Sequence, residues 1–167
     1  MGQVLYPPSI IDISGGVIFL AGPIQGASRW QDEAIRIIQG LDETLNIACP
    51  RRPTLIMEEF GKAEYEAQVD WETHYLRKAG ASGVVMFWLA KEFEHIPNRA
   101  YAQTTRFELG EWKVRHERDQ AKLVIGIEPG FSNERYIRRR LGQDCPNVLI
   151  CSSLQDTCSQ AIKFFYQ

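Results

Sequence analysis

Continuous apolar runs alternate along this chain with segments in which apolar residues recur every three or four positions. A run that is apolar throughout is typical of a strand buried on both faces of a sheet, and the second pattern is typical of an amphipathic helix. The runs predict strands at Val17 to Ala21, Leu45 to Cys49, Gly83 to Leu89, Lys122 to Ile127 and Asn147 to Cys151. The helical spacing predicts helices from Trp30 to Leu41, Glu58 to Ala79, Thr105 to Arg118, Asn133 to Leu141 and Ser153 to Phe165, the last with Ser153 as its N-cap.

Strands that alternate with helices predict an α/β fold with parallel strand pairing. No repeat, low-complexity tract or linker interrupts the order, so a flavodoxin-like three-layer sandwich with a five-stranded, mainly parallel sheet is the simplest architecture. We expect this single domain to cover residues 17–167. Residues 1–16 contain two prolines and no basic start, so we expect a loose N-terminal arm rather than a signal peptide.

The composition narrows the classes of partner. The chain has 167 residues, of which 44% are hydrophobic and 24% charged, and these values are ordinary for a soluble globular domain. Its formal net charge of -2 argues against a nucleic-acid binder, and the basic run Arg135 to Arg140 is expected to be a solvated helix face. No apolar stretch has the roughly 18 residues of a membrane helix. We therefore expect a cytoplasmic protein that binds neither nucleic acid polymers nor membranes.

The metal-binding residue types are scattered. The cysteines form no CxxC pair, and the histidines do not have the HExxH spacing that brings two of them onto one helix face. We therefore expect no metal site and no cofactor. The residues concerned are Cys49, Cys145, Cys151, Cys158, His74, His95 and His116.

The segment Thr105 to Trp112 carries the first candidate for chemistry. It follows an apolar strand and a long polar connection, Lys91 to Gln103. Ligands of open α/β sheets bind beyond the carboxyl ends of the strands, so Glu108 is expected to face that crevice, where a carboxylate can act as a nucleophile. The alternative is that Thr105 and Glu108 form a capping box at the start of the helix.

A second acidic pair, Asp70 and Glu72, lies on the preceding helix. Residues two positions apart point to different sides of a helix, so only one of these carboxylates can face the crevice. The alternative is that both are ordinary surface charges. Between them, Trp71 is expected either to stack on a nucleobase or to pack in the core.

The strand Val17 to Ala21 runs into a tight turn that contains Gly22, Pro23 and Gly26. Small residues let backbone amides approach a flat ligand or an anion. The turn lacks the GxGxxG pattern of dinucleotide-binding proteins and the GK[ST] of a P-loop. A plain strand-to-helix connection explains it equally well.

Three separated motifs together resemble the nucleoside 2-deoxyribosyltransferases. They are Phe19-Leu20-Ala21-Gly22-Pro23-Ile24, the Trp71-Glu72 helix before a strand that ends in Phe87-Trp88-Leu89, and Thr105-x-Phe107-Glu108-Leu109-Gly110. The resemblance runs from about Val17 to Asp156. It implies that Glu108 is the nucleophile and that Glu72 assists at the nucleobase, with Asp70 as the weaker candidate. It also implies that Ala21, Gly22, Pro23 and Ile24 lie along the base, with a hydrogen bond from Gln25.

Two further positions bear on the sugar side. Asn147 matches an Asn that, in the family, reaches the site of the neighbouring subunit, which implies a homo-oligomer with shared active sites. The alternative is an Asn in a turn. Many members carry an Asp about six residues before the nucleophile, whereas this chain has Ala102. Tolerance of a 2′-hydroxyl or a 5′-phosphate is therefore left open.

The activity implied by the resemblance is exchange of the nucleobase of 2′-deoxynucleosides through a covalent glycosyl-glutamate, with ping-pong kinetics and net retention. Small-molecule nucleosides and free nucleobases would be the substrates. One alternative is an N-glycosidase that hydrolyses nucleosides or nucleoside 5′-monophosphates, with Arg29 or Arg106 binding the phosphate. Another is a non-catalytic nucleotide-binding module. Purine or pyrimidine preference is not legible in the sequence.

Overall fold

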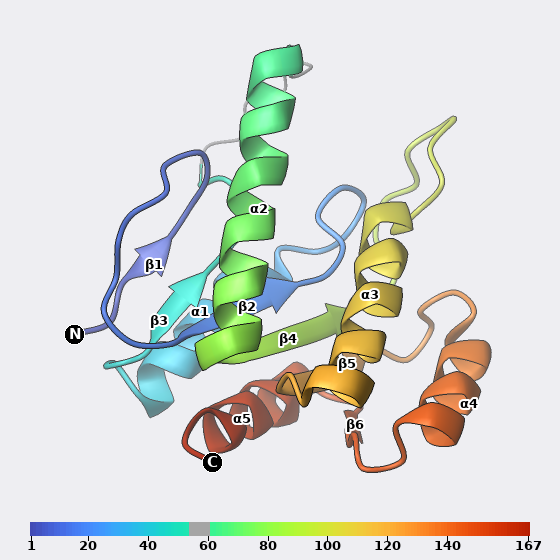
Figure 1. The fold of residues 1–167 in the computed structure, drawn as a ribbon. Helices are drawn as coiled ribbons and strands as arrows, with labels where there is room; N and C mark the ends of the chain where they lie inside the picture. Colours follow the sequence, from blue (N-terminus) through green and yellow to red (C-terminus); the bar gives the residue numbers. More distant parts are fainter. Residues whose placement is uncertain (54–60) are drawn as a thin grey trace.

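The computed structural model describes residues 1–53 and 61–167, which form a parallel sheet between two layers of helices (Figure 1). Six strands pair in the order β1-β3-β2-β4-β5-β6, and every pair is parallel. The predicted α/β class is therefore confirmed, with one strand more than expected. The strands are β1 Val4–Leu5, β2 Val17–Ala21, β3 Asn46–Ala48, β4 Val84–Leu89, β5 Leu123–Ile127 and β6 Ile150–Cys151.

Five helices in the described part of the chain cover the two faces of the sheet. α1 and α5 pack together on one face, and α2 and α3 cover the other, with α4 beside α3 (Figure 1). None of these helices combines the length and apolar character needed to cross a bilayer. The helices are α1 Trp30–Leu41, α2 Lys62–Ser82, α3 Gln103–Asp119, α4 Glu134–Asp144 and α5 Leu154–Phe165. The first residues of the helix predicted from Glu58 lie outside the described residues.

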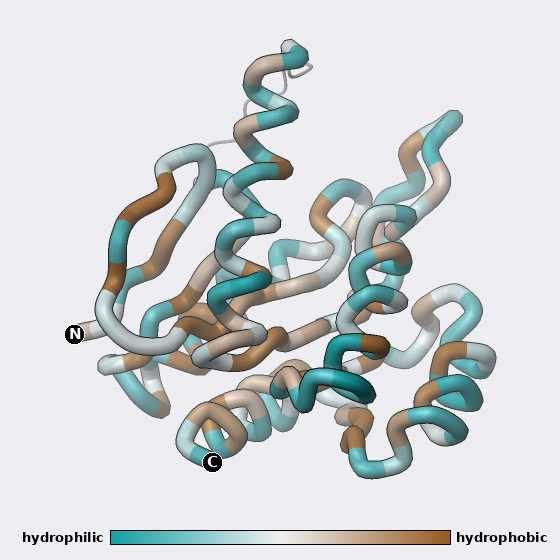
Figure 2. Tube along the Cα trace, viewed as in Figure 1, coloured by the Kyte–Doolittle hydropathy of each residue, from teal (hydrophilic) through white to brown (hydrophobic). Residues whose placement is uncertain are grey.

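Side chains of the central strands alternate between two hydrophobic clusters. In β2, Phe19 packs into the cluster below α2 and α3, whereas Ile18 and Leu20 pack into the cluster below α1 and α5. Figure 2 shows hydrophobic residues concentrated along the strands in the middle of the molecule. Burial on both faces explains why the strands are continuous apolar runs. Leu41, the last residue of α1, is exposed.

The N-terminal arm is packed rather than loose, which corrects the prediction for residues 1–16. Its β1 strand extends the sheet beyond β3. Leu5 and Ile13 are buried, and the Tyr75 hydroxyl on α2 donates a hydrogen bond to the Ile11 carbonyl and accepts one from the Ile11 amide. An edge strand of two residues next to two prolines is too short to show a periodic pattern.

The start of α3 differs from the prediction. Ala102 is the N-cap in a left-handed conformation, and the helix begins at Gln103, two residues earlier than expected. Thr105 lies inside the helix, so it does not cap it, and Glu108 falls in the second turn. The capping-box alternative for Glu108 is therefore wrong.

The strand order determines where a cleft can form. β2 lies between β3 and β4. The chain therefore leaves β2 to form β3 on one side of it, and then crosses over to form β4 on the other side. In open α/β sheets, such a switch in strand order leaves a crevice beyond the carboxyl ends of the strands. This point lies between β2 and β4, next to α2 and α3.

Candidate active site

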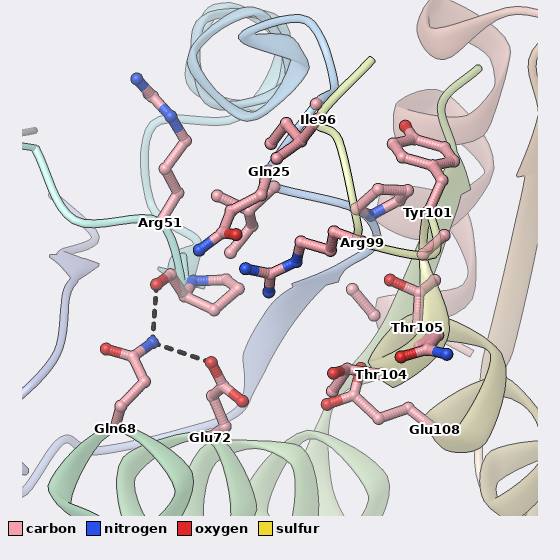
Figure 3. A pocket seen from close by; sticks show the side chains of 18 of the residues that line it. Gln25, Arg51, Gln68, Glu72, Ile96, Arg99, Tyr101, Thr104, Thr105 and Glu108 are labelled. Atoms are coloured by element: carbon pink, nitrogen blue, oxygen red, sulfur yellow. Dashed lines mark hydrogen bonds between the residues drawn. The ribbon is translucent and has the colours of Figure 1, made fainter. Parts of the chain in front are cut away.

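A cleft of about 670 Å³ opens at the carboxyl ends of β2 and β4. Volumes of a few hundred to about 1,000 Å³ are usual for sites that bind small molecules. Its walls are the turn after β2, the segment after β3, the first half of α2, the loop after β4 and the start of α3. Figure 3 shows two carboxylates on its floor, Glu72 from α2 and Glu108 from α3.

The turn after β2 is held from below by α1. The Trp30 indole nitrogen donates to the Pro23 carbonyl at 2.8 Å, and the Gln31 amide nitrogen donates to the same oxygen at 3.2 Å. Gly22 is required here because a Cβ would collide with the Trp88 carbonyl oxygen. All five residues from Ala21 to Gln25 line the cleft, and Trp30 is a core residue, as its place in a buried stripe predicts.

The loop after β4 is fastened to the turn after β2. The Gly26 carbonyl accepts hydrogen bonds from the amides of Phe93 and Glu94, at 2.8 and 3.0 Å. The Tyr101 hydroxyl donates to the Ala90 carbonyl at 2.7 Å and so closes the base of the same loop. These contacts join two segments far apart in the sequence into one wall.

Glu72 is the acidic residue of α2 that faces the cleft. Its side chain is half-buried, and Gln68, one turn earlier, donates a hydrogen bond to its Oε1 atom at 2.8 Å. Burial raises the pKa of Glu72, because it disfavours the charged form, while the hydrogen bond from Gln68 opposes that rise. Glu72 can therefore exchange a proton nearer to neutral pH than an ordinary carboxyl.

Glu108 faces the same space from α3, and its carboxyl forms no hydrogen bond or ion pair with the described residues. Burial raises the pKa of Glu108 to about 8, and the charges of Glu72 and Glu111 add to the rise. Because the charge of Glu72 is felt at Glu108, the two carboxyls form an interacting pair. Like charges in a buried site resist double ionisation, so each carboxyl disfavours ionisation of the other.

Two residues predicted beside Glu72 lie elsewhere. Trp71 is fully buried, packs against Phe19 and Tyr75, and does not line the cleft. Asp70 is exposed and borders a separate surface hollow against the N-terminal arm. Trp71 therefore has the second of its two expected placements, core packing, and Asp70 does not lie in the cleft. The helical geometry that separates Asp70 from Glu72 selects Glu72 as the carboxylate of the cleft.

Neither arginine predicted to bind a phosphate lines the cleft. Arg106 donates to the Ser132 carbonyl at 2.9 Å and lies over the Phe131 ring, and Arg29 pairs with Asp32. The arginines of the cleft are Arg51, Arg52 and Arg99.

These arginines differ in their surroundings. Arg51 is buried and pairs with Asp32 at 2.8 Å, which ties the segment after β3 to α1. Arg99 is exposed on the loop after β4, and it forms no ion pair with the described residues. Figure 3 shows the Arg99 guanidinium pointing into the cleft, above the two carboxylates. An arginine in an irregular loop carries no sequence pattern, so only the spatial arrangement identifies it.

Asn147 is exposed in a turn that precedes β6, not at the start of a strand. In a parallel sheet the residues before a strand lie at the edge opposite the carboxyl ends. Asn147 is therefore remote from the cleft of its own chain.

The cysteines are free thiols, and three of them, Cys49, Cys145 and Cys158, are buried. Burial raises the pKa of Cys49 and of Cys158 to about 12, so both are neutral packing groups at ordinary pH. Within residues 1–53 and 61–167, no three His, Cys, Asp or Glu side chains are grouped so that they could hold a metal ion.

Comparison with known proteins adds the family. A comparison with curated proteins found no match. The model of the family described as nucleoside 2-deoxyribosyltransferase like matches residues 16–131, which include the turn after β2, Glu72 and Glu108 but not Asn147. The match covers well over half of the chain and agrees with the family predicted from the motifs. This chain therefore belongs to the nucleoside 2-deoxyribosyltransferase like family.

Proposed function

We propose that this protein is a nucleoside 2′-deoxyribosyltransferase that exchanges the nucleobase of 2′-deoxynucleosides. The observation that carries the proposal is the carboxyl pair Glu72 and Glu108, half-buried together in a cleft large enough for a nucleoside. Breaking an N-glycosidic bond requires a carboxylate near C1′ of the sugar and an acid near the departing base. The pair supplies both groups in the protonation state in which Glu108 is ionised and Glu72 carries the proton.

In the first half-reaction, a Glu108 oxygen forms a bond to C1′ while the bond between C1′ and the base nitrogen breaks. The electron pair of the broken bond stays on the base, which takes the proton of Glu72. The products are a deoxyribosyl ester of Glu108, a neutral free base and an ionised Glu72. The configuration at C1′ is inverted once.

In the second half-reaction, an incoming base gives its N–H proton to Glu72 and attacks C1′ through that nitrogen. The ester bond breaks and its electron pair returns to Glu108 as a carboxylate. The second inversion gives net retention, and the first base leaves before the second binds, so the kinetics are ping-pong. The cycle restores both carboxyls and needs no further reactant.

The test is to incubate the protein with thymidine or deoxyadenosine, with and without a second base, and to separate the products by chromatography. A new deoxynucleoside that appears only with the second base is the expected result. Free base released at the same rate with or without an acceptor would instead identify a hydrolase. Binding without turnover would identify a non-catalytic module and overturn the proposal.

The cationic Arg99 favours a second candidate function, hydrolysis of nucleoside 5′-monophosphates. Arginine binds phosphate well, and the Arg99 side chain projects into the cleft (Figure 3). In this reaction water, in place of a second base, would attack the same Glu108 ester. Parallel assays with thymidine and thymidine 5′-monophosphate decide between the two. A preference for the phosphate that disappears in Arg99→Ala would support the hydrolase.

We also propose that Asn147 acts at the site of a second copy, because its position cannot serve its own cleft. Mixing inactive Glu108→Ala and Asn147→Ala protomers should then restore part of the activity, since one hybrid site has both residues. Mixed oligomers that form without any recovery would contradict this role of Asn147.

A further inference from the structure

The side-chain amide of Gln68 lies at the centre of a set of hydrogen bonds in the cleft wall. Its nitrogen donates to the Pro50 carbonyl at 2.9 Å and to Glu72 Oε1 at 2.8 Å. Its oxygen accepts a hydrogen bond from Arg52 Nε at 3.1 Å. Figure 3 draws the two bonds donated by Gln68. Pro50, Arg52, Gln68 and Glu72 all line the cleft, so this set of contacts is part of its wall.

The orientation of this amide is unambiguous. A backbone carbonyl such as that of Pro50 can only accept a hydrogen bond, so the group facing it must be the amide nitrogen. A guanidinium nitrogen such as Arg52 Nε can only donate, so the group facing it must be the amide oxygen. Both ends therefore require the same orientation of Gln68. The second hydrogen of its nitrogen is then directed at Glu72.

This orientation determines where Glu72 can carry a proton. Because Oε1 accepts the hydrogen bond from Gln68, a proton on the neutral acid is favoured at Oε2. No described residue forms a hydrogen bond with Oε2, and Figure 3 shows this second oxygen on the side of Glu72 that faces Glu108. The acidic O–H is thus directed into the space where a substrate base would lie.

We propose that Gln68 is a positioning residue that holds Glu72 so that its proton is presented to the nucleobase from Oε2 alone. The inference rests on the proposed exchange reaction and adds a residue outside the three motifs that indicate the family. Arg52 contributes through Gln68, because a cation on the amide oxygen polarises the amide and strengthens its N–H donor. The Pro50 carbonyl, in the segment after β3, accepts the other hydrogen bond of the amide nitrogen and so fixes the orientation of the amide.

The same hydrogen bond acts on both protonation states. When Glu72 is ionised, donation from Gln68 stabilises the negative charge and lowers the pKa against the effect of burial. When Glu72 is neutral, it leaves only one oxygen for the proton. Loss of a positioning residue therefore lowers the rate selectively for substrates that need a proton from Glu72. Loss of a merely structural residue would lower the stability of the fold and the rates for all substrates alike.

The first test compares a nucleoside whose base must be protonated to leave with a derivative whose base leaves more readily without a proton. Suitable pairs are 2′-deoxyuridine with its 5-fluoro derivative, and 2′-deoxyguanosine with its 7-methyl derivative, whichever the wild type accepts. Gln68→Met removes the donor at similar length, and Gln68→Glu keeps the acceptor for Arg52. In both variants we expect kcat for the parent nucleoside to fall about tenfold or more, with a much smaller loss for the activated derivative and little change in KM.

Controls separate this result from a folding defect. Gln39→Met places the same substitution on an exposed position of α1 and should leave both rates unchanged. Thermal unfolding of the Gln68 variants shows whether they fold. Equal losses for the two members of a substrate pair, or no loss for either, would overturn the positioning role.

A second measurement does not depend on activity. With glutamate labelled at its side-chain carboxyl carbon, NMR can follow the titration of Glu72, assigned by comparison with Glu72→Gln. The pKa of Glu72 should rise in both Gln68 variants, because the stabilising donor is lost. An unchanged titration would refute the inference. A wild type without turnover would refute the proposed function instead, so the two failures are distinguishable.

Discussion

The two carboxyls of the cleft are alike in burial and differ in support. Glu72 is held by Gln68, whose own orientation is fixed by two further contacts. Glu108, on the neighbouring helix α3, receives no hydrogen bond from the described residues, and burial raises its pKa to about 8. The difference shows how a single cleft can contain a carboxyl whose direction is fixed by a hydrogen bond and a second carboxyl that receives none from the described residues.

This difference in support suits the two proposed roles. A general acid works best when its O–H points at the atom that receives the proton. A nucleophile gains from the opposite condition, because a carboxylate that lacks hydrogen bonds is less stabilised and therefore more reactive. Removing Glu108 should consequently have the larger effect, and each prediction below tests one side of the comparison.

The largest effect is expected from Glu108→Gln. Loss of the nucleophile should reduce kcat by about a thousandfold or more, measured as base exchange with the preferred deoxynucleoside. Glu111→Gln, on the exposed face of the same helix, is the matched control and should retain turnover. Full activity in Glu108→Gln would remove Glu108 from the reaction.

A smaller loss is expected from Glu72→Gln. General acid assistance contributes roughly a hundredfold to ten-thousandfold, so kcat should fall within that range and recover in part with activated leaving groups. The variant also removes a neighbouring charge, which should lower the pKa of Glu108 and shift the pH profile to lower pH. A loss as complete as that of Glu108→Gln, for all substrates, would argue against separate roles.

Glu108, which receives no hydrogen bond from the described residues, should also make the free energy of unfolding depend on pH. Its pKa rises from the ordinary 4.5 to about 8 in the fold, so the folded state binds this proton more tightly than the unfolded chain. The stability from this proton is complete below about pH 4.5 and is lost as the pH rises through about 8. Relative to wild type, Glu108→Gln should therefore show a smaller fall in unfolding free energy between these limits, by up to about 1.4 kcal/mol per pH unit. Denaturant titrations at several pH values measure this; equal slopes would contradict the raised pKa.

The smallest effect is expected for two buried tryptophans, of which one forms a hydrogen bond through its indole nitrogen and the other forms none with the described residues. Trp30 donates a hydrogen bond to Pro23, whereas no described residue accepts one from the buried indole nitrogen of Trp112. Trp30→Phe should therefore cost about 1 kcal/mol more in unfolding free energy than Trp112→Phe. Denaturant unfolding of both variants checks this. An equal or smaller cost for Trp30→Phe would show that the bond to Pro23 contributes little.

Much of the fold was predictable because burial leaves a strong trace in the sequence. The central strands are apolar at every position, and the prediction of Val17 to Ala21 agrees with β2 at both ends. The start of α3 was not predictable from the sequence, because it depends on the left-handed backbone of Ala102, a residue without a turn preference. β1 was missed because two residues cannot display a period.

The site was only partly predictable for a related reason. Glu72 and Glu108 were found because they belong to motifs, and helical geometry explains why Asp70 points away. Gln68 and Arg99 belong to no motif, and their importance arises only from what lies across the cleft from them. For Trp71 the sequence left stacking on a base and core packing open, and only the structure shows that it packs in the core.

The double contact at the Gly26 carbonyl has a mechanical consequence for how a ligand could enter. Two amides of the loop after β4 donate hydrogen bonds to this one oxygen. The loop after β4 and the turn after β2 are therefore held together at this point. A displacement of either segment would have to break both bonds or carry its neighbour along. Opening of this wall would therefore be a concerted motion of both segments.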